Sequence, residues 1–474
     1  MDLLSPLKPY RPARIGLFAI GLEAYWPQFP GLKERLEGYL RGVEQHLLSS
    51  GDTVISAGLV DTAPRAAEAG ALLAASDLDI IFCHAATYAT SSQVLPVVQR
   101  ARAPVVVLNL QPSARLDYEK CDTGEWLANC SACCVPEIAN AFSRARIPFQ
   151  VVSGMLSGDP DVSREIDEWR AAARAWRALR TARLGFLGHT YPGMLDMYSD
   201  FTLISAQTGA HVEVLEMCDL GRCLRESPPE EAQAVLNLAR ETFILENCPE
   251  EDLEWAARVA AALERLARQF DLDGLAYYYR GLGGNEYERL AAGMILGNSL
   301  LTARGVPASG EGDLKNCVAM KILDALGAGG AFTEIYAMDF VERFVLVGHD
   351  GPGHLALCSR KPVLRGLGLY HGKRGRGVSV EFSVKHGPVT LLGVTQTAEG
   401  RLKLITAEGE SIPGPILRIG NTNTRVRFPL GPAEFVNRWC REAPTHHFAL
   451  GAGRWQAHLE KFSVLAGLEL TRVC

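Results

Sequence analysis

The run Ala13-Arg14-Ile15-Gly16-Leu17-Phe18-Ala19-Ile20 is a short apolar stretch that ends at Gly21. An apolar run of this length, without alternation, is typical of a parallel strand that is buried on both faces of a sheet. Helical and strand-like segments then alternate along the chain, at 32–48, 52–57, 66–75, 78–84 and 104–110. This rhythm predicts an α/β fold with a doubly wound parallel sheet.

In a parallel sheet of this kind, ligands bind at the carboxyl ends of the strands. The first predicted strand is followed by Leu22-Glu23-Ala24-Tyr25-Trp26, and another ends in His84. We therefore expect Glu23, Tyr25 and His84 to be candidates for contact with a substrate.

A charged segment at 163–180 predicts a helix that connects two domains and exposes its many arginines to solvent. A second α/β unit is predicted to follow, because strand-like and helical segments resume at 182–188, 212–217, 251–269 and 272–279. These patterns place an N-terminal α/β domain at 1–178 and a central α/β domain at 179–328.

The composition changes after residue 328, where Gly, Thr and Val increase. Short alternating runs separated by glycine turns appear at 378–384, 389–394 and 402–405, and a final helix is expected at 454–466. Such runs predict a mainly antiparallel β domain, with a barrel-like form, at 329–474.

Composition and charge narrow the class of protein. The 474 residues are 47% hydrophobic and 22% charged, which is typical of a globular protein with more than one domain. The net charge of −6 argues against nucleic acid as a partner. The first six residues have neither a basic start nor an apolar core, and no apolar run is long enough to span a bilayer. These features predict a cytoplasmic protein without a membrane partner.

Twelve cysteines are present, and Cys130, Cys133 and Cys134 form a CxxCC cluster. In a cytoplasmic protein, reduced thiols are expected rather than disulfides. One CxxC pair is half of a zinc site, but no second pair follows it. Ordinary buried or loop thiols are therefore the favoured interpretation, and the role of the cluster stays open.

Four residues in the last third of the chain form a candidate metal site: Glu311, Glu334, His349 and His447. Two carboxylates and two imidazoles suit Mn²⁺, Co²⁺ or Zn²⁺. Taken singly, Glu311 reads as a loop carboxylate and His349 as a turn residue. Glu334 lies in a run that reads as buried, and a buried carboxylate needs a metal or a basic partner.

The neighbours of these residues have predicted roles of their own. Asp313 is expected to cap a helix that runs to Leu326. Adjacent histidines usually point in different directions, so at most one of His446 and His447 is expected to be a ligand, and the other is expected to contact substrate or to hold an orientation.

The order and spacing of these motifs resemble the L-arabinose isomerase family, with L-fucose isomerase as a more distant relative. The resemblance rests on Gly310-Glu311-Gly312-Asp313-Leu314-Lys315, on Phe332-Thr333-Glu334-Ile335-Tyr336, on a strand that ends in His349, and on the pair His446-His447. It covers the final third of the chain by motif and the first two-thirds by domain pattern, as in a divergent member of the family.

The resemblance implies a manganese-dependent aldose–ketose isomerase of unphosphorylated sugars, with an enediol intermediate. Glu311, Glu334, His349 and His447 would be the metal ligands, and the two glutamates would also act as acid and base. Tyr336 and His446 would line the site. Members of the family form trimers or hexamers, in which the N-terminal domain of a neighbour completes the active site.

Two segments depart from the family pattern, namely Gly21–Trp26, where a Gly-Ser-Gln type segment is usual, and the residues after His349. Both would touch substrate, so the sugar stays open. One alternative is therefore a metal-dependent epimerase, or another enzyme that acts on a related sugar or sugar acid. The other is a sugar-binding protein without catalytic activity.

Overall fold

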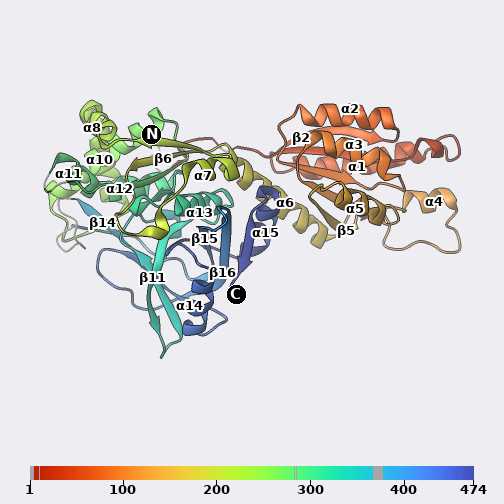
Figure 1. The fold of residues 1–474 in the computed structure, drawn as a ribbon. Coiled ribbons are helices and arrows are strands. Elements are labelled where there is room, and N and C mark those ends of the chain that lie inside the picture. Colours follow the sequence, from red (N-terminus) through yellow and green to blue (C-terminus); the bar gives the residue numbers. More distant parts are fainter. Residues whose placement is uncertain (1–4, 10, 282, 284, 367–376) are drawn as a thin grey trace. The chain divides into compact units, whose positions relative to one another are not determined.

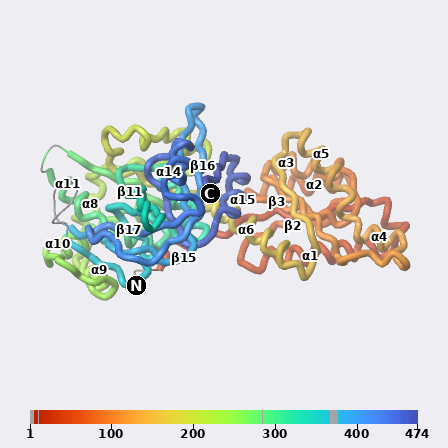
Figure 2. The backbone as a smooth tube through the Cα atoms, turned by 90° about the horizontal axis from the view of Figure 1, so that it is seen from below, coloured from red at the N-terminus to blue at the C-terminus, as the bar shows by residue number. Residues whose placement is uncertain are grey.

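The computed structural model describes residues 5–9, 11–281, 283, 285–366 and 377–474. The chain forms two compact units (Figures 1 and 2). The N-terminal unit comprises residues 11–177, and the C-terminal unit comprises residues 178–474 with the segment that precedes residue 11. The three-domain division at 178 and 328 stays a prediction. Within the described part of the chain, no helix is both long and apolar enough to cross a membrane.

The N-terminal unit is built on a parallel five-stranded sheet with the order β2-β1-β3-β4-β5. Its strands are β1 (Arg14–Ile20), β2 (Thr53–Val60), β3 (Ile80–His84), β4 (Val105–Gln111) and β5 (Phe149–Met155). The strand order reverses between β1 and β3, so their carboxyl ends form the switch point of the sheet. The parallel sheet predicted from the apolar runs is confirmed.

Helices cover both faces of this sheet. They are α1 (Leu32–Leu48), α2 (Ala63–Ala74), α3 (Ser91–Ala101), α4 (Thr123–Ala128), α5 (Val135–Arg144) and α6 (Pro160–Arg180). Phe18 and Ile20 of β1 share one hydrophobic core with α2, α3 and α5. Because side chains alternate along a strand, Ile15 and Leu17 point to the opposite face, where α1 lies.

The predicted connector helix is present as α6, but the prediction of a fully solvated arginine face is wrong. The side chain of Arg170 is only 1% exposed, and it forms an ion pair with the buried carboxylate of Asp52. Arg170 also donates to the main-chain oxygens of His46 and Leu47 at the end of α1. Arg174 binds the same carboxylate, so α6 is fastened to the N-terminal unit through two arginines.

The CxxCC cluster also differs from expectation. Cys130 and Cys133 are joined by a disulfide, so the prediction of reduced thiols is wrong for this pair. Cys134 is a buried free thiol that donates to the main-chain oxygens of Thr87 and Ser131. Burial raises the pKa of this thiol to about 11, which keeps it protonated at neutral pH.

The C-terminal unit contains a second parallel sheet with the order β10-β9-β6-β7. Its strands are β6 (Arg183–Gly188), β7 (His211–Leu215), β9 (Gly274–Tyr278) and β10 (Ala308–Ser309). Its helices are α7 (Phe201–Thr208), α8 (Met217–Glu226), α9 (Pro229–Thr242), α10 (Glu250–Gln269), α11 (Glu286–Ala292), α12 (Met294–Ala303) and α13 (Leu314–Ala325). Val259, Leu263 and Leu266 of α10 are completely buried in the core next to this sheet.

The same unit holds a seven-stranded, mainly antiparallel sheet, which confirms the β-rich character predicted for the C-terminal part. Its order is β15-β18-β11-β12-β17-β16-β19, and only the β16–β19 pair is parallel. The strands are β11 (Ala331–Asp339), β12 (Phe344–His349), β15 (Gly387–Gln396), β16 (Leu402–Ile412), β17 (Thr422–Arg427), β18 (His447–Ala452) and β19 (Glu469–Arg472). Because β15 also pairs with β16, the hydrogen bonding runs round a closed circuit of six strands. The barrel-like form stays a prediction.

A small sheet and two helices also belong to this unit. A small sheet joins β8 (Ile244–Glu246), β13 (Val363–Gly366) and β14 (Val378–Glu381). Two helices, α14 (Pro432–Arg441) and α15 (Gln456–Ala466), follow in the C-terminal part, and α15 is the final helix predicted from the sequence.

Candidate metal centre

Strand register brings three of the four predicted ligands together. In the middle of the antiparallel sheet, Glu334 of β11 lies opposite His447 of β18 on one side and opposite Gly348 of β12 on the other. His349 is the next residue of β12, and its imidazole ring lies beside the side chains of Glu334 and His447. Residues more than a hundred positions apart in the sequence therefore meet because three strands pair in this order.

Glu311 reaches the same place from the parallel sheet. It lies in a short 3-10 segment (Gly310–Gly312) directly after β10, with φ of 59° in the left-handed region. The loop is packed tightly, because a Cβ on Gly312 would lie 2.6 Å from the main-chain oxygen of His189. The main-chain oxygen of Glu311 also accepts a hydrogen bond from the N–H of Tyr191 at 2.9 Å. The surrounding backbone thus fixes the position of this carboxylate.

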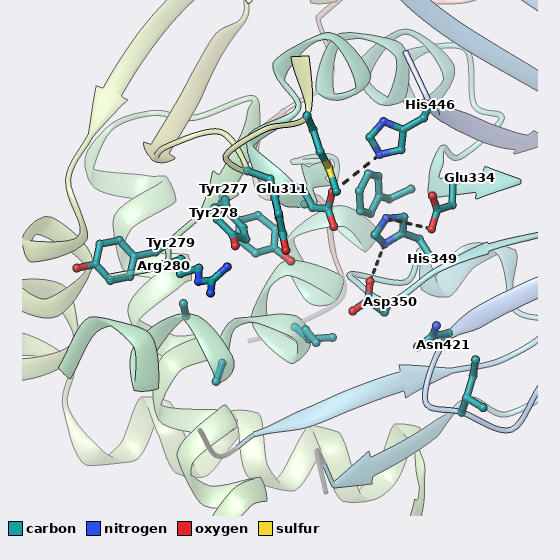
Figure 3. Close-up of a pocket in the computed structure, with 18 of the residues that line it drawn as sticks. Tyr277, Tyr278, Tyr279, Arg280, Glu311, Glu334, His349, Asp350, Asn421 and His446 are labelled. Atoms are coloured by element: carbon teal, nitrogen blue, oxygen red, sulfur yellow. Dashed lines mark ion pairs between the residues drawn. The ribbon is translucent and has the colours of Figure 1, made fainter. Parts of the chain in front are cut away.

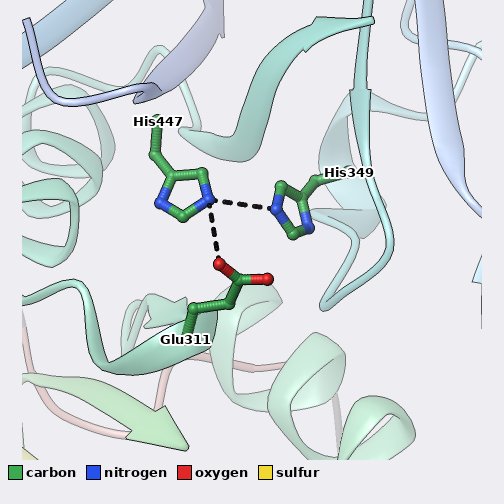
Figure 4. Close-up of side chains that lie close together, drawn as sticks. All are labelled: Glu311, His349 and His447. Carbon is green, nitrogen blue, oxygen red and sulfur yellow. Dashed lines mark hydrogen bonds and ion pairs between the residues drawn. The ribbon is translucent and has the colours of Figure 1, made fainter. Parts of the chain in front are cut away.

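The four side chains form one cluster, and Figure 4 shows three of them, namely Glu311, His349 and His447. The Nε2 atoms of His349 and His447 are 3.1 Å apart. A carboxylate lies near each of them, since Glu311 Oε2 is 3.6 Å from Nε2 of His447 and Glu334 Oε1 is 3.8 Å from Nε2 of His349. Both imidazoles are buried, and both glutamates are partly exposed, with 20% and 32% of their side chains accessible. Glu334 is therefore less buried than its sequence context suggested.

Two aspartates hold the far sides of these imidazole rings. Asp313 Oδ2 is 3.0 Å from Nδ1 of His447, and both side chains are completely buried. Asp350 Oδ1 is 3.1 Å from Nδ1 of His349. A carboxylate beside Nδ1 favours a proton on that atom, which leaves the Nε2 lone pair directed into the cluster.

The two facing lone pairs repel each other unless a positive charge lies between them. The pKa values agree with this picture. Burial, aided by the charge of His349 and opposed by Asp313, lowers the pKa of His447 to about 4. For His349, burial acts to lower the pKa, but Asp350, Glu334 and Glu311 outweigh it and raise the pKa. The cluster therefore attracts a proton or a metal cation to the space between the two nitrogens.

The donor set fits a divalent metal. Ligating atoms of Glu311, His349 and His447 lie within 4.8 Å of one another, and so do those of Glu334, His446 and His447. Two nitrogen ligands about 2.1 Å from a shared ion lie roughly 3.0–3.4 Å apart, which agrees with the His349–His447 spacing. Imidazole nitrogens with carboxylate oxygens suit ions of intermediate hardness.

His446 has a different environment from His447. Its Nδ1 lies 2.7 Å from Asp196 Oδ2, and its main-chain N–H donates to the same oxygen at 2.9 Å. Burial acts to raise the pKa of Asp196, but the bonds from His446 outweigh it and lower the pKa. Nε2 of His446 lies 4.0 Å from Glu311 Oε2. Asp196 thus orients His446 toward the cluster.

The cluster opens into a cavity of about 1080 Å³ in the C-terminal unit (Figure 3). Tyr336 lines it, and its hydroxyl accepts a hydrogen bond from Asn421 Nδ2 at 2.8 Å. Burial and the nearby Asp350 raise the pKa of this phenol, so it stays neutral. A row of residues at the end of β9 and directly after it forms another part of the wall: Tyr277, Tyr278, Tyr279 and Arg280. Hydroxyl groups and aromatic rings of this kind suit a polyhydroxylated ligand.

The other three predicted site residues belong to the N-terminal unit. Glu23 is exposed and Tyr25 is half-buried, in a 3-10 turn (Glu23–Tyr25) after β1. His84 ends β3 and is completely buried, without a hydrogen-bond partner for either nitrogen among the described residues. Burial lowers its pKa to about 4. The substrate contacts predicted for these residues stay predictions.

Sequence reasoning missed several residues in and around the site. Asp196 gave no signal, because it lies 250 positions before His446 and no local pattern links the two. Asp313 was expected to cap α13, which it does by accepting from the N–H of Asn316, but its contact with His447 was not foreseen. The position of Arg280 depends on where β9 ends, so only the structure places it in the wall.

Comparison with known proteins agrees with the motifs. No protein-family model matches the chain. The L-arabinose isomerase of Acidothermus cellulolyticus is 24% identical over 388 residues, which cover 78% of this chain and 76% of that protein. The L-arabinose isomerase of Herpetosiphon aurantiacus is 24% identical, with 82% and 79% covered. The sulfoquinovose isomerase of Priestia aryabhattai is 21% identical, with 83% and 85% covered. The resemblance to the L-arabinose isomerase family is confirmed, and the chain is a divergent relative of proteins named as sugar isomerases.

Proposed function

We propose that this protein is a metal-dependent aldose–ketose isomerase. The observation that carries the proposal is the pair of facing Nε2 atoms of His349 and His447, 3.1 Å apart and flanked by Glu311 and Glu334, on the wall of a large cavity. The relatives support a sugar as substrate. The names of these relatives include both arabinose and a sulfonated sugar, so the relatives do not identify the sugar that this protein would convert.

Glu311, Glu334, His349 and His447 would hold a divalent metal, and Mn²⁺ is the ion that the family resemblance implies. When bound, such a cation stabilises negative charge that develops on the two neighbouring oxygens of an open-chain sugar during enolisation. The carboxylates of Asp313 and Asp350 serve this site by holding the two imidazoles with Nε2 directed inward.

The two glutamates would carry the proton transfers. One carboxylate removes the proton from C2 of the aldose and returns it to C1, which converts the aldose into the ketose through an enediol. The second carboxylate passes the hydroxyl proton between the oxygens on C2 and C1. His446, which Asp196 orients, and Tyr336, which Asn421 holds, would bind sugar hydroxyls. A positioned general base of this kind contributes roughly 10²–10⁴-fold to the rate.

The test is turnover of a panel of aldoses with and without Mn²⁺, Co²⁺ or Zn²⁺. Glu334→Gln should lower kcat by about 100-fold or more. Glu342→Gln is the matched control, because Glu342 lies between β11 and β12, is 57% exposed and pairs with Arg425 outside the cavity. Failure of the metal-loaded protein to convert any aldose would refute the proposal.

Reaction in deuterated water separates isomerisation from epimerisation. An isomerase that works through an enediol can place solvent deuterium on C1 of the ketose product, whereas an epimerase returns an aldose. Binding of a sugar without any conversion would instead favour a sugar-binding protein. The trimer or hexamer that the resemblance implies, with a neighbour's N-terminal unit at the site, is part of this proposal.

A further inference from the structure

Arg280 is the one arginine or lysine that lines the cavity among the residues that the structure describes. It follows Tyr278 and Tyr279 at the end of β9. Figure 3 shows Arg280 and Tyr279 on one side of the cavity, with Glu334, His349 and His446 on the other. A lone cation at a distance from the metal centre has no part in the enolisation chemistry, so it needs a separate explanation.

The guanidinium of Arg280 has no partner within the described part of the chain. It forms no ion pair or side-chain hydrogen bond there, although its backbone N–H bonds to His189. Of the acidic residues in the wall, Glu334 and Asp350 pair with His349. Glu288 also lines the cavity. The five N–H donors of a guanidinium suit an anion with several oxygens.

Strand pairing places Arg280 and Glu311 at the same edge of the parallel sheet. β9 and β10 are adjacent and parallel, with Ser309 opposite Ala276, so the residues that follow them lie at the same edge of the sheet. Adjacent strands are about 4.8 Å apart. The phenol of Tyr278 has its pKa raised to about 12, mainly by burial and by Tyr191, while Arg280 opposes the rise and Glu311 adds to it. The charges of Arg280 and Glu311 therefore both affect the pKa of the Tyr278 hydroxyl group.

The length of the proposed substrate can be worked out for a six-carbon sugar in its open form. The four bonds from C2 to C6 span roughly 5 Å, and an acidic group on C6 adds to that reach. A sugar whose C1 and C2 oxygens lie at the metal centre would then extend along the tyrosines toward Arg280. At that end, a neutral hydroxymethyl group would leave the cation without a counter-charge.

We propose that Arg280 binds an anionic group at the end of the sugar remote from the carbonyl, and that the preferred substrate is an acidic aldose. This inference rests on the proposed isomerase function and narrows its substrate class. A carboxylate, a sulfonate and a phosphate share the oxygen chemistry that a guanidinium recognises.

The experiment compares four aldoses that share one configuration at C2–C5 and differ only at C6. Glucose, glucuronate, 6-deoxy-6-sulfoglucose and glucose 6-phosphate form one set, and the galactose counterparts form a second. We expect kcat/KM to be about 10- to 100-fold higher for at least one acidic member than for the neutral sugar of its set. Arg280→Gln should remove that preference, because it should raise KM for the acidic sugar about 10- to 100-fold more than KM for the neutral sugar.

Two controls accompany this variant. Arg454→Gln removes an arginine that is 66% exposed, pairs with Glu408 and is absent from the cavity wall. This variant should change kcat/KM for neither the acidic nor the neutral sugar. Arg280→Lys keeps the charge but loses the planar fork, so it should retain part of the preference. Equal or better turnover of the neutral sugar by the wild type would overturn the inference, and so would an equal loss for both substrates in Arg280→Gln.

Calorimetric binding of the corresponding alditols, which cannot be isomerised, separates the inference from the proposed function. Binding of an acidic alditol that is lost in Arg280→Gln, without turnover of any aldose, would refute the isomerase and leave the anion site standing. Turnover of acidic and neutral aldoses with equal kcat/KM, and with the same values in Arg280→Gln, would support the isomerase and refute the anion site.

Discussion

Asp313 has two roles that one substitution can separate. Its Oδ1 accepts a hydrogen bond from the N–H of Asn316 and caps α13, and its Oδ2 lies 3.0 Å from Nδ1 of His447. Asparagine caps a helix about as well as aspartate. In Asp313→Asn, the remaining oxygen can keep the cap, which turns the amide NH₂ toward His447. That group donates, so the imidazole must accept at Nδ1 and carry its proton on Nε2, the atom that faces the metal centre.

The expected effect is therefore large on metal binding and small on folding. Loss of a carboxylate behind a ligating histidine commonly lowers metal affinity by about 10–100-fold, or roughly 1.4–2.7 kcal/mol. The free energy of unfolding of the metal-free protein should fall by about 1 kcal/mol or less, because the cap is retained and only the charge near the helix N-terminus is lost. Titration calorimetry with Mn²⁺ measures the first quantity, and denaturant unfolding measures the second.

Asp200→Asn is the matched control. Asp200 caps α7 in the same way, by accepting from the N–H of Leu203 at 3.0 Å. It has no histidine contact among the described residues, so its substitution should leave metal affinity at the wild-type value. The reasoning fails if Asp313→Asn binds Mn²⁺ as tightly as the wild type, or if both variants lose affinity equally.

Three further predictions concern other charged groups. Asp196→Ala removes both bonds to His446, so kcat/KM for the sugar should fall about tenfold at saturating metal while metal affinity is kept; a loss of metal binding would contradict an orienting role. In the N-terminal unit, the pKa of His84 is lowered from 6.5 to about 4 by burial, so the unfolded chain binds the proton more readily between these pH values. Stability should therefore fall as the pH decreases from 6.5 toward 4, and His84→Gln should reduce the loss between pH 7.5 and pH 5 by about 2 kcal/mol, as denaturant unfolding at the two pH values would show. Asp52→Asn leaves the buried Arg170 without its counter-charge and should cost about 3–5 kcal/mol of unfolding free energy, whereas Asp161→Asn, which breaks an exposed pair on the same helix, should cost less than about 1 kcal/mol; similar losses in both variants would refute the distinction.

The buried parallel strands are the part of the fold that the sequence predicts well. Runs such as Ala13–Ile20 are apolar on both faces, and a strand covered by helices on both sides requires that pattern. Strand β5 (Phe149–Met155) was not predicted, because it forms an edge of its sheet and only Val152 is buried, so it has no continuous apolar run. The small sheet of β8, β13 and β14 was missed for another reason. In this sheet β8 pairs with β13, which lies more than a hundred residues later in the chain, and the local sequence of neither strand indicates the other as its partner.

For the candidate site too, features of the local sequence were predicted and contacts between distant segments were not. Local composition was enough to single out Glu311, Glu334, His349 and His447, since each stands in a short segment rich in glycine, aromatic residues or histidine. Their convergence, however, depends on strand register, and the partners of the imidazoles depend on packing between the two sheets. The exposure predicted for Arg170 was wrong for the same reason. An arginine on a charged helix is expected to be solvated, and the local sequence does not show that the buried Asp52 of another segment lies beside it.

The closed circuit of strands has a consequence for how this protein can change during evolution. A strand that is paired on both sides cannot slip by one residue without breaking hydrogen bonds to two neighbours and turning its buried side chains outward. The inner positions of β11, β12 and β18 are therefore locked in register, while the turn after β9 that carries Arg280 lies outside that circuit. Residues at the cavity rim should thus be exchanged more readily during evolution than Glu334, His349 and His447, whose strands are paired on both sides.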